Sequence, residues 1–275
     1  MDTGTTIRFL LTVHYDGSGF HGWQFQPELR TVQGELEGVL GRLAGRPRTV
    51  VGSGRTDTGV HAVGQVASVD MPTRWTAREL HRALNATLPP DVWVQEVAAA
   101  RPDFHPRYDA LSRTYVYRVG TTPVARSPFH RRWCWPLGES LDVPALNRLS
   151  VEVVGEHSFG AFAKAGQPER GTRCTVATAH WDAWDMGTRF TITADRYLHH
   201  MVRYLVGTMV DIARGRRATQ DLSALLVETV GVETSPPAPP EGLFLSQVEY
   251  PDTVRLPGGA RPSKPHAEPR SETTR

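Results

Sequence analysis

The part of this 275-residue sequence best suited to chemistry is Gly52–Ala62, which reads GSGRTDTGVHA. It holds one carboxylate, Asp57, with Arg55 two residues before it and glycines on both sides. Glycines allow sharp turns and let a ligand approach the main chain closely. A lone carboxylate in such a loop can act as a nucleophile or as a base. By spacing alone, the same residues also fit an ordinary Asx turn with a neighbouring ion pair.

Two other motifs suggest chemistry that their surroundings do not support. Gly17–Gly22 matches the GxGxxG fingerprint of dinucleotide-binding folds, but Pro27 follows where the helix should run, so we interpret it as a glycine-rich turn. His199 and His200 suggest a metal site. Consecutive side chains on a helix point about 100° apart, however, and no HExxH spacing accompanies the pair. We therefore expect no metal and no cofactor.

The remaining nucleophiles and the apolar segments exclude several further classes of protein. Ser53 and Ser158 lack the GxSxG elbow and the ordered base of a hydrolase triad. Cys134 and Cys174 lack CxxC spacing, so we expect neither a disulfide framework nor a cysteine-built zinc site, and a reducing, cytoplasmic setting. No apolar stretch reaches the roughly 18 residues that span a bilayer. We expect a soluble protein without a targeting segment or a membrane partner.

The elements around the Asp57 segment follow the order β-α-β-β-α-β, which is typical of ferredoxin-like folds. Alternating or β-branched runs predict the strands, and apolar residues at helical spacing predict the helices. Thr31 is expected to cap the first helix, and Gly45 to end it. The predicted elements are strand 7–14, helix 31–43, strands 49–53 and 64–69, helix 76–86 and strand 92–97.

A second α+β half repeats this order in pattern, although not in residues. Its predicted elements are strand 113–119, helix 143–149, strands 175–184 and 189–193, helices 198–214 and 222–228, and strand 243–250. We expect residues 1–108 and 109–250 to form two related halves. Residues 251–275, rich in Pro, Gly, Ser, Thr and charges, are expected to be a disordered tail.

The net charge of +2 predicts no partner, but the distribution of arginine does. Residues 101–135 hold seven arginines against two aspartates, and residues 186–217 hold six against two. All basic residues except Lys164 and Lys264 are arginine, whose planar guanidinium suits phosphates and stacks on bases. Both segments are therefore candidate phosphate-contacting surfaces. A genome rich in G and C would explain the arginine content equally well.

Several segments, in order over residues 7–250, resemble the tRNA pseudouridine synthase A (TruA) family. Gly52–Ala62 is similar to its catalytic motif. The other similar segments are Tyr15–Gln24, Arg30–Gly34, Leu84–Pro89, Phe104–Ala110, Ser112–Tyr117, Leu198–Arg203 and Ala238–Leu243. The sequence departs from the family at Ser53 and Thr58, where alanine is usual, and at Tyr204, where asparagine is common.

The resemblance implies an enzyme that breaks the N1–C1′ bond of a uridine in tRNA, turns the base and joins C5 to C1′. It implies Asp57 as the catalytic carboxylate, either as a nucleophile at C1′ or as a base at C2′. It implies Arg203 as the paired cation, within about 4 Å of Asp57. A helical wheel places Arg203 at the edge of the apolar stripe, where its side chain could face either the solvent or a cleft. Gly207, four residues on, leaves room for a strand or ligand and favours the cleft.

The resemblance further implies Tyr115 as an aromatic that stacks on the uracil, although Tyr115, like Tyr117, could equally be a core residue. By analogy, Arg55 is expected to hold a phosphate or to fill the gap left by the flipped nucleotide. Contacts to the tRNA backbone are expected from Arg126, Arg131, Arg132, Arg214, Arg216 and Arg217.

For the whole molecule, the resemblance implies one mixed sheet shared by both halves, with helices on one face and the active-site cleft between the halves. It also implies a homodimer, and uridines at positions 38 to 40 of the anticodon stem-loop as targets. A non-catalytic RNA-binding protein on the same fold remains an alternative, which the Asp57→Asn variant would separate from an enzyme. A nicotinamide-dependent oxidoreductase is a third, and cofactor binding that quenches tryptophan fluorescence would identify it.

Overall fold

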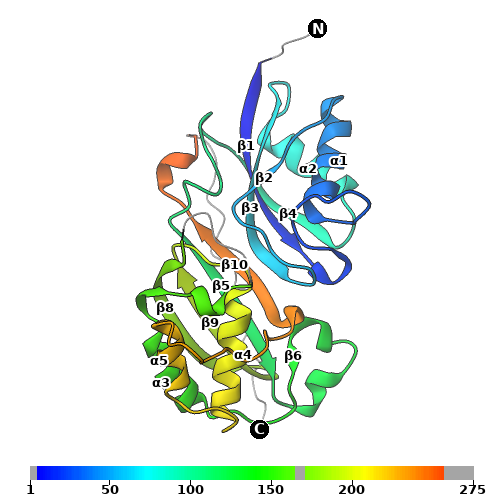
Figure 1. The fold of residues 1–275 in the computed structure, drawn as a ribbon. Helices are drawn as coiled ribbons and strands as arrows, with labels where there is room; N and C mark the ends of the chain where they lie inside the picture. Colours follow the sequence, from blue (N-terminus) through cyan, green and yellow to red (C-terminus); the bar gives the residue numbers. More distant parts are fainter. Residues whose placement is uncertain (1–4, 165–170, 257–275) are drawn as a thin grey trace, which may run out of the picture.

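The computed structural model describes residues 5–164 and 171–256, whose strands form one mixed sheet (Figure 1). The strands follow the order β4-β1-β3-β10-β5-β9-β8-β7, with β2 beside β3 and β6 beside β5. The strands are β1 (Thr6–Tyr15), β2 (Val51–Gly52), β3 (His61–Pro72), β4 (Val92–Ala99), β5 (Ser112–Gly120), β6 (Trp135–Pro136), β7 (Gly155–Ser158), β8 (Arg173–Trp184), β9 (Gly187–Ala194) and β10 (Leu243–Glu249). The helices are α1 (Val32–Ala44), α2 (Ala77–Thr87), α3 (Val143–Glu152), α4 (Met201–Ala213) and α5 (Asp221–Leu226).

Each half of the sheet has the ferredoxin-like strand order. In the N-terminal half, β1 lies between β3 and β4 and pairs antiparallel with both. In the C-terminal half, β5 lies between β9 and β10, again antiparallel to both. The predicted α+β fold with one mixed sheet is thus confirmed. The halves meet where β10 pairs in parallel with β3, through Phe244 with His61 and Leu245 with Ala62.

The ends of α1 predicted from capping residues are confirmed. α1 begins after Thr31, whose side chain accepts a hydrogen bond from the N–H of Gly34, and it ends at Gly45 in the left-handed conformation. α2 begins after Thr76, which forms a capping box with Glu79. These ends depend on local chemistry, so the sequence alone could place them.

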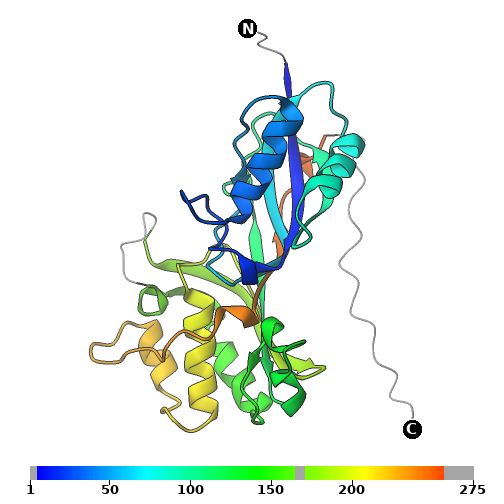
Figure 2. The ribbon, with the colours of Figure 1, turned by 90° about the vertical axis from the view of Figure 1, so that its right-hand side faces the viewer.

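Two apolar cores lie on the same face of the sheet, one in each half. α1 and α2 cover the first, and α3, α4 and α5 cover the second; Figure 2 shows the helices of each half beside their part of the sheet. Leu243 of β10 belongs to the C-terminal core and Leu245, on the same strand face, to the N-terminal core. Tyr115, the β5 partner of Leu245, packs against both cores and therefore lies where the halves meet.

The predicted start of α4 is wrong by three residues. The helix begins at Met201 instead of Leu198, because His200 adopts a left-handed backbone with φ 66° and ψ 2°. A right-handed helix cannot include such a residue. Residues 198–200 therefore form a turn, whose side chains need not follow helical spacing.

The predicted tail also begins too early. Asp252–Val254 form a short 3₁₀ helix, and Val254 is buried in a small cluster on the other face of the N-terminal half, with Leu10 and Phe104. The rest of the predicted tail, residues 257–275, lies outside the described residues. Of the helices within residues 5–164 and 171–256, none has the length and apolar character needed to cross a membrane.

Candidate active site

The loop between β2 and β3, which carries Asp57, is held by buried side chains of the N-terminal half. The Ser53 hydroxyl donates to Oε1 of Gln65 at 2.7 Å, close to the start of the loop. In the middle of the loop, the Thr56 hydroxyl lies 2.7 Å from the hydroxyl of Tyr15. All four of these supporting residues are buried, whereas the Asp57 side chain keeps 20% of its surface exposed. The loop is thus a fixed support that presents one carboxylate.

The glycine-rich turn at residues 17–22 packs directly against this loop. A Cβ at Gly17 would lie 2.0 Å from the carbonyl oxygen of Val60, and one at Gly22 would lie 2.7 Å from that of Thr56. The same Thr56 oxygen accepts a hydrogen bond from the N–H of Trp23 at 3.0 Å. The glycines allow two backbone segments to touch, which confirms the interpretation as a turn.

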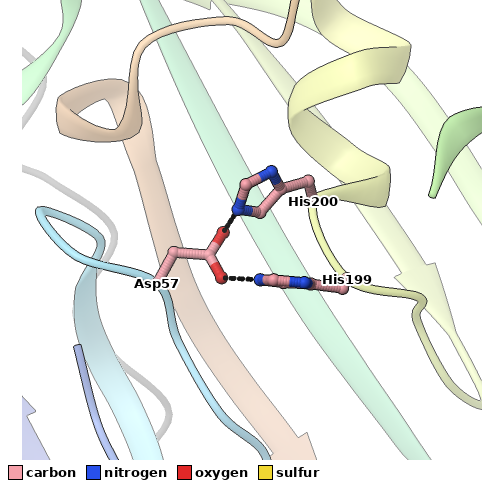
Figure 3. Close-up of side chains that lie close together, drawn as sticks. All are labelled: Asp57, His199 and His200. Atoms are coloured by element: carbon pink, nitrogen blue, oxygen red, sulfur yellow. Dashed lines mark ion pairs between the residues drawn. The ribbon is translucent and has the colours of Figure 1, made fainter. Parts of the chain in front are cut away.

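Three basic side chains of the C-terminal half surround Asp57. Nε2 of His199 lies 3.1 Å from Oδ1, and Nε2 of His200 lies 3.3 Å from Oδ2 (Figure 3). Nη1 of Arg203 lies 3.5 Å from Oδ2. The expected proximity of Asp57 and Arg203 is therefore confirmed, and the contact joins the two halves of the molecule.

Arg203 is fixed by a segment that runs along α4 before β10. Its Nε donates to the carbonyl oxygen of Ala238 at 2.7 Å, and the N–H of Ala238 donates to the Arg203 carbonyl oxygen at 2.9 Å. The segment can approach because of Gly207, where a Cβ would lie 2.3 Å from the Pro236 carbonyl oxygen. Only 12% of the Arg203 side chain is exposed, so it faces Asp57 and not the solvent.

The structure separates Tyr115 from Tyr117. Tyr117 is fully buried and its hydroxyl donates to the carbonyl oxygen of Pro239, so it is a core residue. Tyr115 is partly exposed and makes an edge-to-face contact with Tyr197, with ring centroids 4.9 Å apart. Burial of its phenol raises the pKa of Tyr115 well above the usual 10, and the charge of Asp57 raises it further. Tyr115 is therefore a neutral phenol in the electrostatic neighbourhood of Asp57.

The candidate RNA-contacting arginines fall into two groups. Arg55 and Arg131 are exposed, with no ion pair recorded within the described residues, and the exposed Arg126 only approaches a backbone oxygen at 3.5 Å. The others are held in ion pairs: Arg132 with Asp16, Arg214 with Glu139, Arg216 with Asp211 and Arg217 with Asp221. The first group is the more available to phosphates.

His199 and His200 are the residues of the site that sequence reasoning missed. A helix through Leu198 would point them apart, whereas the left-handed backbone of His200 leaves both imidazoles beside Asp57, with ring centroids 4.1 Å apart. The sequence signal that could have indicated them is the family-like segment Leu198–Arg203, because it contains both histidines together with the arginine that pairs with Asp57.

The ligand atoms of Asp57, His199 and His200 lie within 4.8 Å of one another, which is close enough for a metal ion to bridge them. The ground on which the sequence argued against a metal, that the histidines diverge, is therefore wrong. Arg203 nevertheless places a permanent positive charge 3.5 Å from Oδ2, which opposes a second cation at that oxygen. The arrangement suits a carboxylate flanked by a guanidinium and two imidazoles better than a metal centre.

Comparison with known proteins covers most of the chain. The sequence profile of the family described as tRNA pseudouridine synthase matches residues 11–109 and 149–251. The tRNA pseudouridine synthase A of Moorella thermoacetica is 40% identical over 242 residues, which are 87% of this chain and 98% of that protein. The protein of the same name from Geobacillus kaustophilus is 39% identical over 248 residues, 90% of this chain and 96% of its own. Since the Asp57 loop and α4 both lie inside the matched regions, the chain belongs to the tRNA pseudouridine synthase family.

Proposed function

We propose that Asp57 is the carboxylate with which this isomerase converts uridine to pseudouridine in tRNA. The observation that carries the proposal is the contact of Asp57 with Arg203, at 3.5 Å across the two halves. A cation beside a carboxylate stabilises its charged form, and the charged form is the one that acts as a nucleophile or a base. The fixed loop and the fixed guanidinium supply this arrangement before the substrate arrives.

The isomerisation needs no oxidant or reductant. The bond from uracil N1 to C1′ breaks with its electron pair on N1; C5 of the turned base then bonds to C1′ and loses its proton, while N1 gains one. Asp57 can attack C1′ and form an ester that C5 displaces, or it can take a proton from C2′ and return it. Both routes require one carboxylate oxygen to meet the ribose in a defined orientation.

Two further residues have proposed roles around the reacting nucleotide. Tyr115, partly exposed between the two cores, offers a ring on which uracil can stack. Arg55 is exposed two residues before Asp57, where it can hold a phosphate or occupy the space of the flipped nucleotide. Backbone contacts are proposed for Arg126 and Arg131, whose side chains are exposed.

For the substrate, we propose uridines at positions 38 to 40 of the anticodon stem-loop, and for the assembly a homodimer, both from the family resemblance. A cytoplasmic location, where tRNA matures, accords with Cys134 and Cys174 as buried free thiols. Mapping of pseudouridine in tRNA from a deletion strain tests the positions. Sedimentation equilibrium tests the dimer, and a single monomeric species would exclude it.

The decisive experiment is tritium release from tRNA labelled at uridine C5, with the Asp57→Asn variant. This substitution keeps the size of the side chain and removes its charge, so we expect conversion to fall by at least about 10³-fold, while tRNA affinity changes little. Asp185→Asn is the matched control, because Asp185 is an exposed carboxylate in the turn between β8 and β9. Full conversion by Asp57→Asn would exclude Asp57 as the catalytic carboxylate, whereas a wild-type chain that binds tRNA without converting it would favour a protein that only binds RNA.

A further inference from the structure

The two oxygens of Asp57 contact different imidazoles that belong to consecutive residues. His199 reaches Oδ1 at 3.1 Å and His200 reaches Oδ2 at 3.3 Å (Figure 3). Consecutive side chains on a helix or a strand point in different directions, so two imidazoles beside one carboxylate require a backbone conformation that is neither helix nor strand. It is supplied by His200, whose φ of 66° lies in the left-handed region that a residue with a Cβ seldom adopts.

Backbone hydrogen bonds on both sides hold this turn in place. The carbonyl oxygen of His199 accepts from the N–H of Lys164 at 3.0 Å, and that of His200 accepts from the N–H of Tyr204 at 3.1 Å. Strained residues persist only where the surrounding structure fixes them, and they gather at functional sites. The strain at His200 is thus tied to the position of its imidazole beside Asp57.

The two histidines differ in how firmly they are held. The side chain of His200 is 15% exposed, whereas that of His199 is 57% exposed. Oδ2 faces His200 and also Arg203, at 3.5 Å, while Oδ1 faces only the exposed imidazole among the described residues. One oxygen therefore has two partners that are mostly shielded from solvent, and the other has one exposed partner that can move away.

Burial and neighbouring positive charge both favour the neutral form of the His200 imidazole. Burial lowers the pKa of His200 below the usual 6.5, and the positive charges of His199, Arg203 and Lys164 lower it further, against the opposing charge of Asp57. Because a carboxylate only accepts, a neutral imidazole can donate to Oδ2 only when Nε2 carries its proton. Contacts of this kind are often long without substrate and shorten in the substrate complex.

We propose that His200 is a positioning residue that, with Arg203, holds Oδ2 of Asp57, so that Oδ1 is the oxygen that reacts with the ribose. His199 is the displaceable partner of Oδ1, and it leaves that oxygen when uridine enters. This inference rests on the proposed role of Asp57. It assigns different roles to the two oxygens, and neither the family match nor the Arg203 contact gives that assignment.

The test begins with His200→Gly, which removes the imidazole and relieves the left-handed strain, so the fold is expected to remain at least as stable. We expect kcat to fall about ten- to a hundredfold, the range for one hydrogen bond to a charged group, with KM for tRNA unchanged within about twofold. The matched control is Glu28→Gly, since Glu28 is an exposed residue with φ 62°. A kcat for His200→Gly equal to that of Glu28→Gly overturns the proposal.

Two further variants separate positioning from mere packing. His200→Gln keeps the strained backbone and offers an amide N–H near the place of Nε2, so we expect it to recover kcat to within about threefold of the wild type. If Gln is as poor as Gly, the N–H is not what matters and the proposal fails. His199→Ala is expected to lower kcat less than His200→Gly does, because His199 leaves Oδ1 when uridine enters. A loss as large as that of His200→Gly would contradict the assignment of the two oxygens.

The same assay run on Asp57→Asn distinguishes this inference from the proposed function. If Asp57→Asn retains conversion, the role of Asp57 itself is wrong. If Asp57→Asn is inactive while His200→Gly is fully active, Asp57 keeps its role and only the positioning by His200 is overturned.

Discussion

Nε2 of His61 donates to the carbonyl oxygen of Arg132 at 3.0 Å and so ties the first residue of β3 to the C-terminal half, directly after the Asp57 loop. Nδ1 of the same ring accepts from the N–H of Gly17 at 3.0 Å, which requires a neutral imidazole. Burial lowers the pKa of His61, against the opposing charge of Asp16. An uncharged histidine therefore supplies one of the contacts between the halves.

Stability is expected to fall in mild acid. The pKa values of His14, His61 and His200 are all lowered, chiefly by burial, so below pH 6.5 the unfolded chain binds protons that the folded chain does not. Their contribution is complete above pH 6.5 and is lost as the pH falls through the lower folded values, by at most ~1.4 kcal/mol per pH unit for each histidine. Urea unfolding at several pH values measures this. His14→Gln should make the free energy of unfolding less dependent on pH. A free energy of unfolding that rises below pH 6.5 would contradict this prediction.

Alanine at two helical glycines is expected to have opposite effects. At Gly207 of α4 the new Cβ would meet the Pro236 carbonyl oxygen at 2.3 Å, so Gly207→Ala should destabilise by about 1–3 kcal/mol and displace the segment that fixes Arg203, lowering kcat. At Gly38 of α1 the nearest atom is the end of the Arg42 side chain at 3.8 Å, so Gly38→Ala should stabilise by about 0.5–1 kcal/mol. Thermal unfolding and kcat of both variants check this. Equal effects would show that α4 does not need the close approach.

Ionisation of Tyr115 is expected to play no part in the alkaline limb of the pH–rate profile. Its pKa is raised by burial and by Asp57, so the phenol stays protonated up to pH 10 and beyond. Tyr115→Phe should therefore leave the alkaline limb where it is in the wild type, and Tyr115→Leu, which lacks a ring, should lower kcat much more than Phe does. An alkaline limb that disappears in Tyr115→Phe would assign a titrating role to the hydroxyl.

The salt dependence of tRNA binding distinguishes the two groups of arginines. Arg131→Gln should reduce the slope of log K against log salt by about 0.7–0.9, the value for one phosphate contact. Arg216→Gln serves as the control, because Arg216 is paired with Asp211 at 3.8 Å. Filter binding over a range of salt concentrations gives both slopes. Identical slopes for Arg131→Gln and the wild type would remove Arg131 from the interface.

Much of the N-terminal half could be predicted because its signals are local. The cap at Thr31 and the helix end at Gly45 each involve neighbours within a few residues, and the structure has both. The turn interpretation of Gly17–Gly22 is equally local, since Pro27 alone argues against a helix.

What the sequence could not supply depends on contacts between distant segments. The turn that contains the left-handed His200 is held by the N–H of Lys164, which donates to the His199 carbonyl oxygen, and no spacing near His200 indicates this contact. A helical wheel could not show whether Arg203 faces the solvent or a cleft, because the direction of its side chain depends on contacts with Asp57 and with the Ala238 carbonyl oxygen. The family resemblance located the segments, and only the folded chain shows which of their atoms meet.

The pairing of β3 with β10 extends over just two residue pairs, His61 with Phe244 and Ala62 with Leu245. So short a pairing resists tilting of the two halves only weakly, and it lies close to the contact of Asp57 in one half with Arg203 in the other. A substitution deep in either core that rotates its half by a few degrees will thus alter the spacing at Asp57 before it unfolds anything. Reaction rate, in this architecture, is a more sensitive gauge of core packing than melting temperature.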